Sequence, residues 1–401
     1  MYLFVFSLIL QSAGATQALS LSHYSNTTSY PTNISAESCA TYNSYIYCVA
    51  GLNGTQPSNN TYFAQLTSSG ISKWTNTTSY PFKITNHSCV ASQGYLYCTG
   101  GVIKENVSNS SFYARIGSSG IGNWTSTTPY PNMTGSQSCS AYNGYIYCIG
   151  GSNIFNSTKS AYFASLSSGG IGRWLPTSSY PIYINSNSCV INGNYIYCVA
   201  GSSKINYTSD VYYASLSPSG ISQWHRTTNY PNATSSLSCF SIGGSIFCTG
   251  GAVTPAANVS ISSTAAAYTA SLSPSGVGNW GPVSSYPYPA SGMSCVPYGS
   301  SAYCIGGSLH AVGLYSPIDT NMSVVYHAIN PSIPQTSSPT TMQVQTPNVT
   351  SSQPPTPPPP QETSGNSYLL LIVIVVLVAL MILALYLFNR KSSPQSQDPQ
   401  H

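Results

Sequence analysis

Charged side chains are scarce in this sequence. Ten Lys and Arg and six Asp and Glu make up 4% of its 401 residues, whereas a typical soluble protein has about 25%. The formal net charge of +4 is spread along the chain without a basic run, so nucleic-acid binding has no electrostatic basis. Scarce carboxylates also leave few ion pairs to lose on protonation. We therefore expect the melting temperature to change little between about pH 2 and 7.

The composition otherwise predicts a folded protein of an oxidising compartment. A hydrophobic fraction of 42% is enough to build a core. Twelve cysteines are unusual for a reducing compartment. Sixteen Asn-x-Ser/Thr sequons, from Asn26 to Asn348, indicate the secretory route, where this acceptor motif is glycosylated.

Membrane signals stand at both ends of the chain. Residues 1–18 combine an apolar run with small residues, typical of a signal peptide, although basic residues are missing before the run. Residues 368–388 are uninterruptedly apolar and span about 31 Å as a helix, enough to cross a bilayer. Two basic residues follow, which predicts a cytoplasmic tail at 389–401 and a single-pass type I protein of the cell membrane. Residues 331–367, rich in Pro, Ser and Thr, read as an extended stalk.

The cysteines reveal an internal repeat. Each of six units has a first cysteine and a second one nine positions later, and successive units are spaced by 50 residues, or 56 at the last step. The pairs are Cys39 and Cys48, Cys89 and Cys98, Cys139 and Cys148, Cys189 and Cys198, Cys239 and Cys248, and Cys295 and Cys304. Six units therefore fill residues 22–330.

Each unit contains four short strand-like runs with fixed landmarks. A Gly doublet such as Gly150 and Gly151 follows the second run, a Tyr lies in the third, and a Trp such as Trp174 opens the fourth. This pattern resembles the kelch motif. The resemblance implies an all-β fold, a six-bladed kelch-like β-propeller, to which the sequence adds a single C-terminal transmembrane α-helix.

The phase of the repeat predicts how the ring closes. Residues 24–31 copy residues 74–81, so the chain begins with the fourth strand of a unit. It also ends on a third strand, residues 324–329, with no Trp strand after it. We therefore expect the N-terminal strand to complete blade six and remove the open edges.

The cysteine pairs predict six local disulfides. Each pair is symmetric about two residues, such as Asn143 and Gly144, that favour a tight hairpin. The cysteines then oppose each other at a non-hydrogen-bonded position, with Cα atoms about 4.5 Å apart. Free buried thiols are one alternative. Zinc ligation is another alternative, but a zinc site needs four ligands around one point, and cysteine pairs on separate strand ladders do not bring four together. We expect no metal and no cofactor.

The two faces of such a propeller should differ. Turns between the first and second and between the third and fourth strands are short, whereas loops between the second and third strands are long and variable. Because the last strand runs away from its long loop, the stalk should leave from the tight-turn face. The long-loop face then points outward. Twelve sequons lie on the long-loop side: Asn33, Asn53, Asn59, Asn86, Asn106, Asn109, Asn132, Asn156, Asn206, Asn232, Asn258 and Asn321.

The long-loop face is the candidate interaction surface, and a passive glycan-coated cap is its alternative. Tyrosines such as Tyr45 and Tyr47 are expected to pack between blades. We expect a non-catalytic recognition or adhesion module with an extracellular protein or glycan ligand, or else a structural cell-coat component.

An enzyme is the rival class. Kelch propellers include copper oxidases, but the histidines here occupy different phases of different blades. A glycan-processing enzyme would have to use Glu105, Asp210 and Asp319, which share the long-loop region of blades two, four and six.

Overall fold

The computed structural model describes residues 23–153, 156–203, 206–254, 262–312 and 317–329. The predicted signal peptide, stalk, transmembrane helix and tail lie outside these ranges. Within them, no helix has the length and apolar character needed to cross a membrane.

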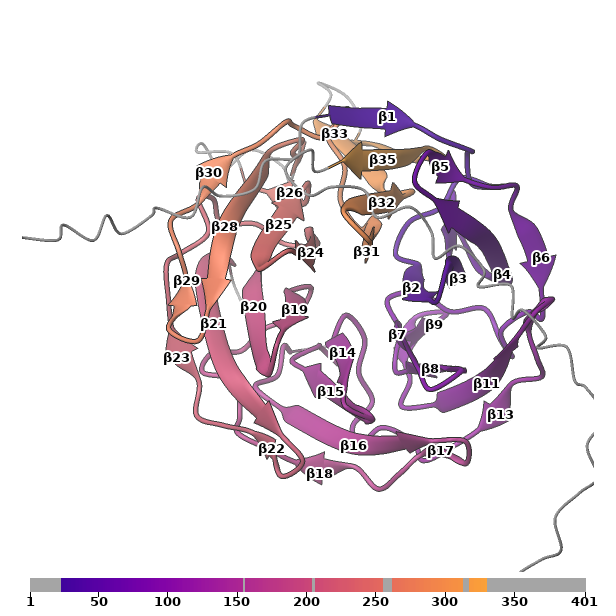
Figure 1. Cartoon of the computed structure of the whole chain (residues 1–401), viewed down its shortest axis with the longest axis horizontal. Coiled ribbons are helices and arrows are strands. Elements are labelled where there is room, and N and C mark those ends of the chain that lie inside the picture. Colours follow the sequence, from indigo (N-terminus) through magenta and orange to yellow (C-terminus); the bar gives the residue numbers. More distant parts are fainter. Residues whose placement is uncertain (1–22, 154–155, 204–205, 255–261, 313–316, 330–401) are drawn as a thin grey trace, which may run out of the picture. The chain divides into compact units, whose positions relative to one another are not determined.

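The chain forms a six-bladed β-propeller, with antiparallel sheets arranged around a central axis (Figure 1). Strands a to d of each blade run from the axis outward. They are β2 (Ser38–Tyr42), β3 (Tyr45–Asn53), β4 (Gln56–Thr67) and β6 (Thr75–Thr77) in blade 1; β7 (Ser88–Ser92), β8 (Tyr95–Thr99), β11 (Ser111–Gly117) and β13 (Thr125–Ser126) in blade 2; and β14 (Ser138–Tyr142), β15 (Tyr145–Ile149), β16 (Ala161–Ser167) and β18 (Leu175–Pro176) in blade 3.

Blades 4 to 6 repeat the arrangement. Their strands are β19 (Ser188–Asn192), β20 (Tyr195–Ser202), β21 (Tyr207–Ser217) and β23 (His225–Arg226) in blade 4; β24 (Ser238–Ile242), β25 (Ser245–Thr249), β28 (Ala267–Ser273) and β30 (Gly281–Pro282) in blade 5; and β31 (Ser294–Tyr298), β32 (Ser301–Ile305), β35 (Val325–Ile329) and β1 (His23–Asn26) in blade 6.

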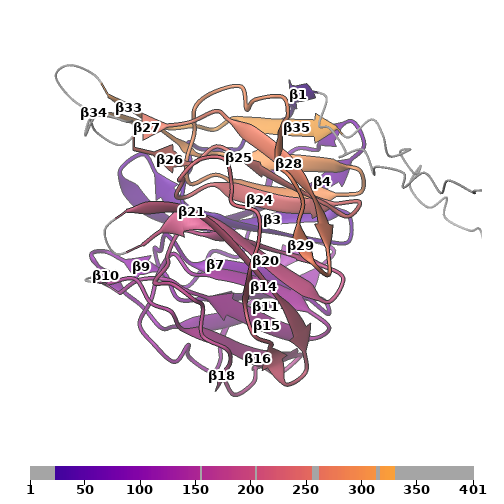
Figure 2. The ribbon, with the colours of Figure 1, turned by 90° about the vertical axis from the view of Figure 1, so that its left-hand side faces the viewer.

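Two kinds of short element were not predicted. After each c strand of blades 1 to 5, two residues fold back on its end: β5 (Gly70–Ile71), β12 (Gly120–Ile121), β17 (Gly170–Ile171), β22 (Gly220–Ile221) and β29 (Gly276–Val277). Three b–c loops form hairpins: β9 (Val102–Ile103) with β10 (Asn106–Val107), β26 (Ala252–Val253) with β27 (Ser262–Ser263), and β33 (Ser308–Val312) with β34 (Pro317–Asn321). Figure 2 shows these hairpins along one side of the ring.

The predicted ring closure is confirmed. Strand β1 pairs antiparallel with β35, from His23 opposite Ile329 to Asn26 opposite Tyr326. Tyr24 takes the place that a Trp has in the other blades and packs edge-on against Tyr286, with ring centroids 5.4 Å apart. The first and the last of the described strands therefore build one blade, as the copied segment predicts.

The six predicted disulfides are present. In every blade the first cysteine, on strand a, lies directly opposite the second, on strand b, and their Cα atoms are 3.9–4.1 Å apart. None of the described cysteines is free. The bridges staple the two innermost strands of each blade.

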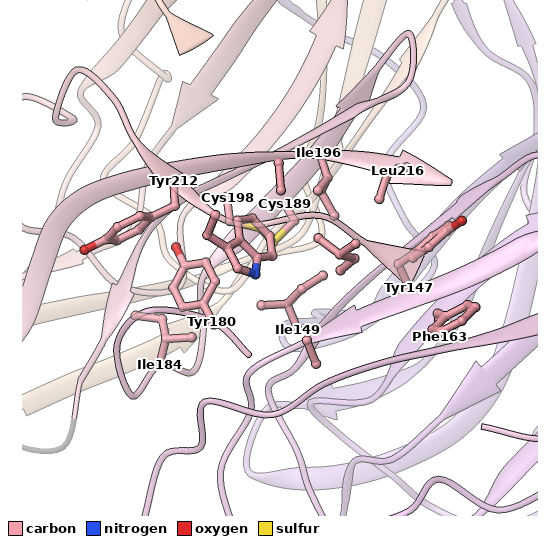
Figure 3. Close-up of a cluster of buried hydrophobic side chains, with 14 residues drawn as sticks. Tyr147, Ile149, Phe163, Tyr180, Ile184, Cys189, Ile196, Cys198, Tyr212 and Leu216 are labelled. Carbon is pink, nitrogen blue, oxygen red and sulfur yellow. A yellow bond between two sulfur atoms is a disulfide. The ribbon is translucent and has the colours of Figure 1, made fainter. Parts of the chain in front are cut away.

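The hydrophobic core lies between blades. At the junction of blades 3 and 4, Tyr147 and Ile149 of one blade meet Ile196 and Leu216 of the next (Figure 3). Tyr180 packs edge-on against Trp224 with ring centroids 5.0 Å apart, and the Trp224 indole N–H donates to the Ser178 carbonyl at 2.9 Å. The same Tyr and Trp contact recurs at Trp74, Trp124, Trp174 and Trp280. Each Trp therefore joins two blades.

Candidate binding surface

The structure separates a tight-turn face from a long-loop face. On the tight-turn face each c strand of blades 1 to 5 bonds back to the a–b turn, as where the Leu166 N–H donates to the Gly144 carbonyl at 2.7 Å. Strand β35 ends on this face, because Ile329 lies opposite Ser301, directly after an a–b turn. The described chain therefore leaves the propeller on the side opposite the long loops.

Most of the predicted glycosylation sites are accessible. Asn59 and Asn109 are half-buried, and the Asn59 side-chain amide donates to the Tyr80 carbonyl at 3.2 Å. Asn258 and the side chain of Asn321 fall outside the description. The remaining eight are exposed: Asn33, Asn53, Asn86, Asn106, Asn132, Asn156, Asn206 and Asn232. Glycosylation of these residues stays a prediction.

The long-loop end of the central channel is framed by a closed hydrogen-bonded ring. Six residues with φ between 51° and 65°, one before each a strand, each donate a backbone N–H to the carbonyl of the equivalent residue in the preceding blade, at 2.8–3.0 Å. They are Ala36, Asn86, Ser136, Ser186, Ser236 and Gly292. The ring surrounds a depression of about 140 Å³. Its side chains have no common type, which explains why the sequence did not reveal it.

A second ring lies one step deeper. The hydroxyl oxygen of the Ser before each first cysteine accepts a hydrogen bond from the cysteine N–H of the next blade, at 2.8–3.2 Å. These residues are Ser38, Ser88, Ser138, Ser188, Ser238 and Ser294. The signal was visible in the sequence as a Ser-Cys pair in all six units. Beyond them a part of the channel with a mixed polar and apolar lining, about 300 Å³, extends toward the tight turns.

Between these rings, the residue preceding this Ser is buried in every blade; it is polar in blades 1 to 4 and apolar in blades 5 and 6. Glu37, His87, Gln137 and Asn187 are all at most 7% exposed, and each has at least one buried polar atom without a hydrogen-bond partner among the described residues. Burial raises the pKa of Glu37 to about 8, against a smaller opposing effect of nearby backbone amides, and lowers the pKa of His87 to about 4. Both groups are therefore neutral over a wide range around neutral pH.

His87 does not form a metal centre with its neighbours. One of its ring nitrogens lies within 4.8 Å of the sulfur atoms of Cys89 and Cys98, but these sulfurs are joined in a disulfide and are not thiolate ligands. His327 stacks on Tyr303 in blade 6 with ring centroids 4.7 Å apart, and His225 is exposed in blade 4. His87 and His225 thus lie in blades other than that of His327, although β1 and β33 place His23 and His310 in blade 6 as well.

The carboxylates considered as catalytic groups of a glycan-processing enzyme also lie in different blades. Glu105 is exposed between β9 and β10 of blade 2, and Asp210 lies on β21 of blade 4, where it forms an ion pair with Arg226. Blades 2 and 4 are not neighbours in the ring. The side chain of Asp319 lies outside the description. The structure therefore does not assemble Glu105 and Asp210 into one acid–base pair.

Two grooves open on the long-loop face. One, of about 400 Å³ between blades 3 and 4, is lined by Lys159, Ile182, Tyr183, Ser203, Tyr207, Thr208 and Asp210. The other, of about 450 Å³ between blades 2 and 3, is flanked by the sequons Asn132 and Asn156. Sequence reasoning missed both, because each combines side chains from two blades.

The comparisons with known proteins concern the fold. No protein-family model matches the sequence, and no curated protein sequence is similar to it. Among solved structures, the chain is similar to YjhT, with a TM-score of 0.62 and 15% sequence identity over 74% of this chain and 96% of that one. At this identity the likeness is one of architecture: the chain shares a six-bladed β-propeller fold with YjhT.

Proposed function

We propose that the protein is a non-catalytic recognition or adhesion module of the cell surface that binds an extracellular protein or glycan through its long-loop face. One observation carries this proposal. Of the four large apolar side chains exposed among the described residues, Met133, Tyr183 and Tyr288 lie on the d–a links of this face, at 57%, 54% and 52% exposure. All three thus lie on one face of the ring, and loops held by a rigid scaffold are where binding sites usually lie.

The cellular setting is part of the proposal. Six disulfides fit an extracellular compartment. The apolar segment at residues 368–388 supports a single-pass anchor, and the kelch-like repeat supports a binding role. With the described chain ending on the tight-turn face, a membrane anchor beyond it would leave the long-loop face directed outward.

Binding of the full chain to glycan and extracellular-protein arrays, combined with a screen of glycosidase substrates, tests the proposal. We expect saturable binding without turnover, weakened by alanine at Tyr183 or Tyr288. Turnover that is lost in Glu105→Gln or Asp210→Asn would replace it with the enzyme hypothesis. Absence of any saturable ligand would favour a structural cell-coat role.

A further inference from the structure

The groove between blades 3 and 4 departs from the repeat at the positions that build it. Hydrogen bonds and strand pairing place Lys159, Tyr183, Asp210 and Arg226 at defined positions of the repeating unit. The other five units supply twenty residues at these four positions, and Lys83 is the one charged or aromatic residue among them. The equivalents of Lys159 are Asn59, Asn109, Ser209, Ala265 and Ser323, and those of Tyr183 are Asn33, Lys83, Met133, Ala233 and Pro289. The equivalents of Asp210 are Asn60, Ser110, Ser160, Ala266 and Val324, and those of Arg226 are Asn26, Asn76, Ser126, Pro176 and Pro282.

The fold does not explain these four residues. Five other units build the same blade with small or polar residues at the same positions, so a propeller blade needs neither the charges nor the ring. Tyr183 is 54% exposed and therefore contributes little to the core. In a chain with 4% charged residues, three charged side chains beside one groove are a marked concentration. We attribute the departure to binding.

The side chains of the groove are arranged as a platform with a polar edge. The Lys159 ammonium lies 5.1 Å from the centre of the Tyr183 ring, a cation–π contact. Asp210 forms an ion pair with Arg226, and its backbone N–H donates to the Thr208 hydroxyl at 3.0 Å. The Asp210 side chain is 22% exposed. Arg226 thus holds the Asp210 carboxylate in place at the surface while acceptor capacity remains.

We infer that this groove binds a pyranose ring of a glycan. The C–H face of a sugar is apolar and stacks on an exposed aromatic ring, whereas its hydroxyls require fixed acceptors and donors at the edge. Tyr183 supplies the ring, Asp210 the acceptor, and Lys159 with the hydroxyl of Thr208 the donors. A volume of about 400 Å³ lies at the small end of ligand sites. This inference rests on the proposed recognition function and names its ligand class and its place.

The d–a link beside this groove carries no sequon, although the sequon Asn206 on the neighbouring b–c loop borders the groove. The d–a links of blades 1, 2, 4 and 6 carry Asn86, Asn132, Asn232 and Asn33, whereas residues 180–187 and 286–293 carry none. The exposed Tyr183 and Tyr288 lie on these two sequon-free links. Met133, the equivalent of Tyr183 in the neighbouring groove, follows the sequon Asn132. A ligand therefore meets no predicted glycan on the link that carries Tyr183.

The experiment measures binding of the methyl glycosides of glucose, galactose, mannose, N-acetylglucosamine and glucuronic acid to the full chain by saturation-transfer NMR and titration. Tyr183→Ala, Lys159→Gln and Asp210→Asn are compared with Leu175→Ala, which removes an exposed apolar side chain on β18 of blade 3 that lines neither groove. All variants are also made on an Asn206→Gln background, because that sequon borders the groove. Thermal unfolding verifies that each variant is folded.

We expect at least one glycoside to bind, and Tyr183→Ala and Asp210→Asn each to weaken it by about tenfold while Leu175→Ala leaves it unchanged. If Lys159→Gln loses binding of the glucuronide but keeps binding of the neutral glycosides, the preferred ligand is an acidic sugar. No glycoside binding in either background overturns the inference, as does a peptide ligand that needs Tyr183. Binding of a glycan or protein that is unaffected by the groove variants overturns the inference alone and leaves the proposed function standing.

Discussion

The tyrosine hydroxyls fall into two classes according to their partners. The Tyr97 hydroxyl donates to the Ser167 carbonyl of the next blade at 2.7 Å, and Tyr147, Tyr197 and Tyr303 repeat this bond between other blades. The Tyr80 hydroxyl is buried and has no partner among the described residues, and burial raises its pKa well above the usual value. A tyrosine hydroxyl therefore stabilises the fold at Tyr97, where it is hydrogen-bonded. At Tyr80 it destabilises the fold, because it loses its hydration without gaining a partner.

We expect opposite results from removing these two hydroxyls. Tyr97→Phe should lower the free energy of unfolding by about 1 kcal/mol because it removes a hydrogen bond that joins two blades. Tyr80→Phe should be neutral or stabilising. Chemical unfolding of the two variants measures the difference. Equal losses would show that the ring packing, not the hydroxyl, decides both positions.

Among the elements, the glycine after each b strand shows what sequence could and could not predict. The Gly doublet could be recognised in the sequence as a landmark of the repeat. The sequence did not reveal why the second position of the doublet requires glycine. Gly51 has φ of 104°, and a Cβ there would lie 2.8 Å from the Cβ of Glu37. The residue before each Ser-Cys pair thus packs onto the second glycine of the doublet, a contact between segments that periodicity alone does not reveal.

Two glycines of one hairpin give a matched test of this contact. Gly51 and Gly54 both have positive φ, but no atom lies within 4 Å of a Cβ at Gly54. Gly54→Ala should therefore cost about 1 kcal/mol of backbone strain. Gly51→Ala adds the clash with Glu37 and should cost about 3 kcal/mol or more. Urea unfolding compares them, and similar costs would contradict the close-packing argument.

The b–c hairpins show why other elements were missed. Strands a to d follow from period-two patterns and turn residues, and the disulfides from a fixed spacing. In blades 1 and 4, where Ala50 and Ala200 stand in the doublet with φ of 53°, the b strand instead continues through an irregularity into a longer hairpin. The two-residue strands such as β5 depend on the neighbouring blade, since the Ile71 N–H donates to the Thr27 hydroxyl at 2.8 Å. Such contacts exist only once the ring is assembled.

For the whole molecule, the ring depends on its first strand. Removal of residues 1–30 would leave the outer edge of β35 unpaired and remove the Thr27, Thr28 and Tyr24 contacts that join blade 6 to blades 1 and 5. We expect the truncated chain to unfold at least 10 °C lower in a thermal scan, by loss of several kcal/mol. A synthetic peptide of residues 22–31 should restore part of the loss. A truncated chain as stable as the full one would show that closure does not depend on β1.

The predicted acid stability has a second source in two buried groups whose titrations have opposite effects on stability. The pKa of Glu37 is raised from 4.5 to about 8, so the folded chain binds this proton more tightly and its stabilising effect, complete below about pH 4.5, is lost as pH rises toward 8. The pKa of His87 is lowered from 6.5 to about 4, so its contribution is present above about pH 6.5 and is lost as pH falls toward 4. Between about pH 6.5 and 4.5 the two slopes cancel.

A nearly flat stability curve in this window is thus expected by compensation, in addition to the scarcity of ion pairs. Glu37→Gln removes one side of the balance, and the variant should lose about 3 kcal/mol between pH 7 and 4 because His87 alone then titrates. His87→Gln should instead gain stability as pH falls from 8 to 4.5. Gln137 shows that this side chain fits the equivalent position. Unfolding free energies across pH 4–8 measure both slopes, and a flat curve for Glu37→Gln would mean that His87 accepts its proton without cost in the folded chain.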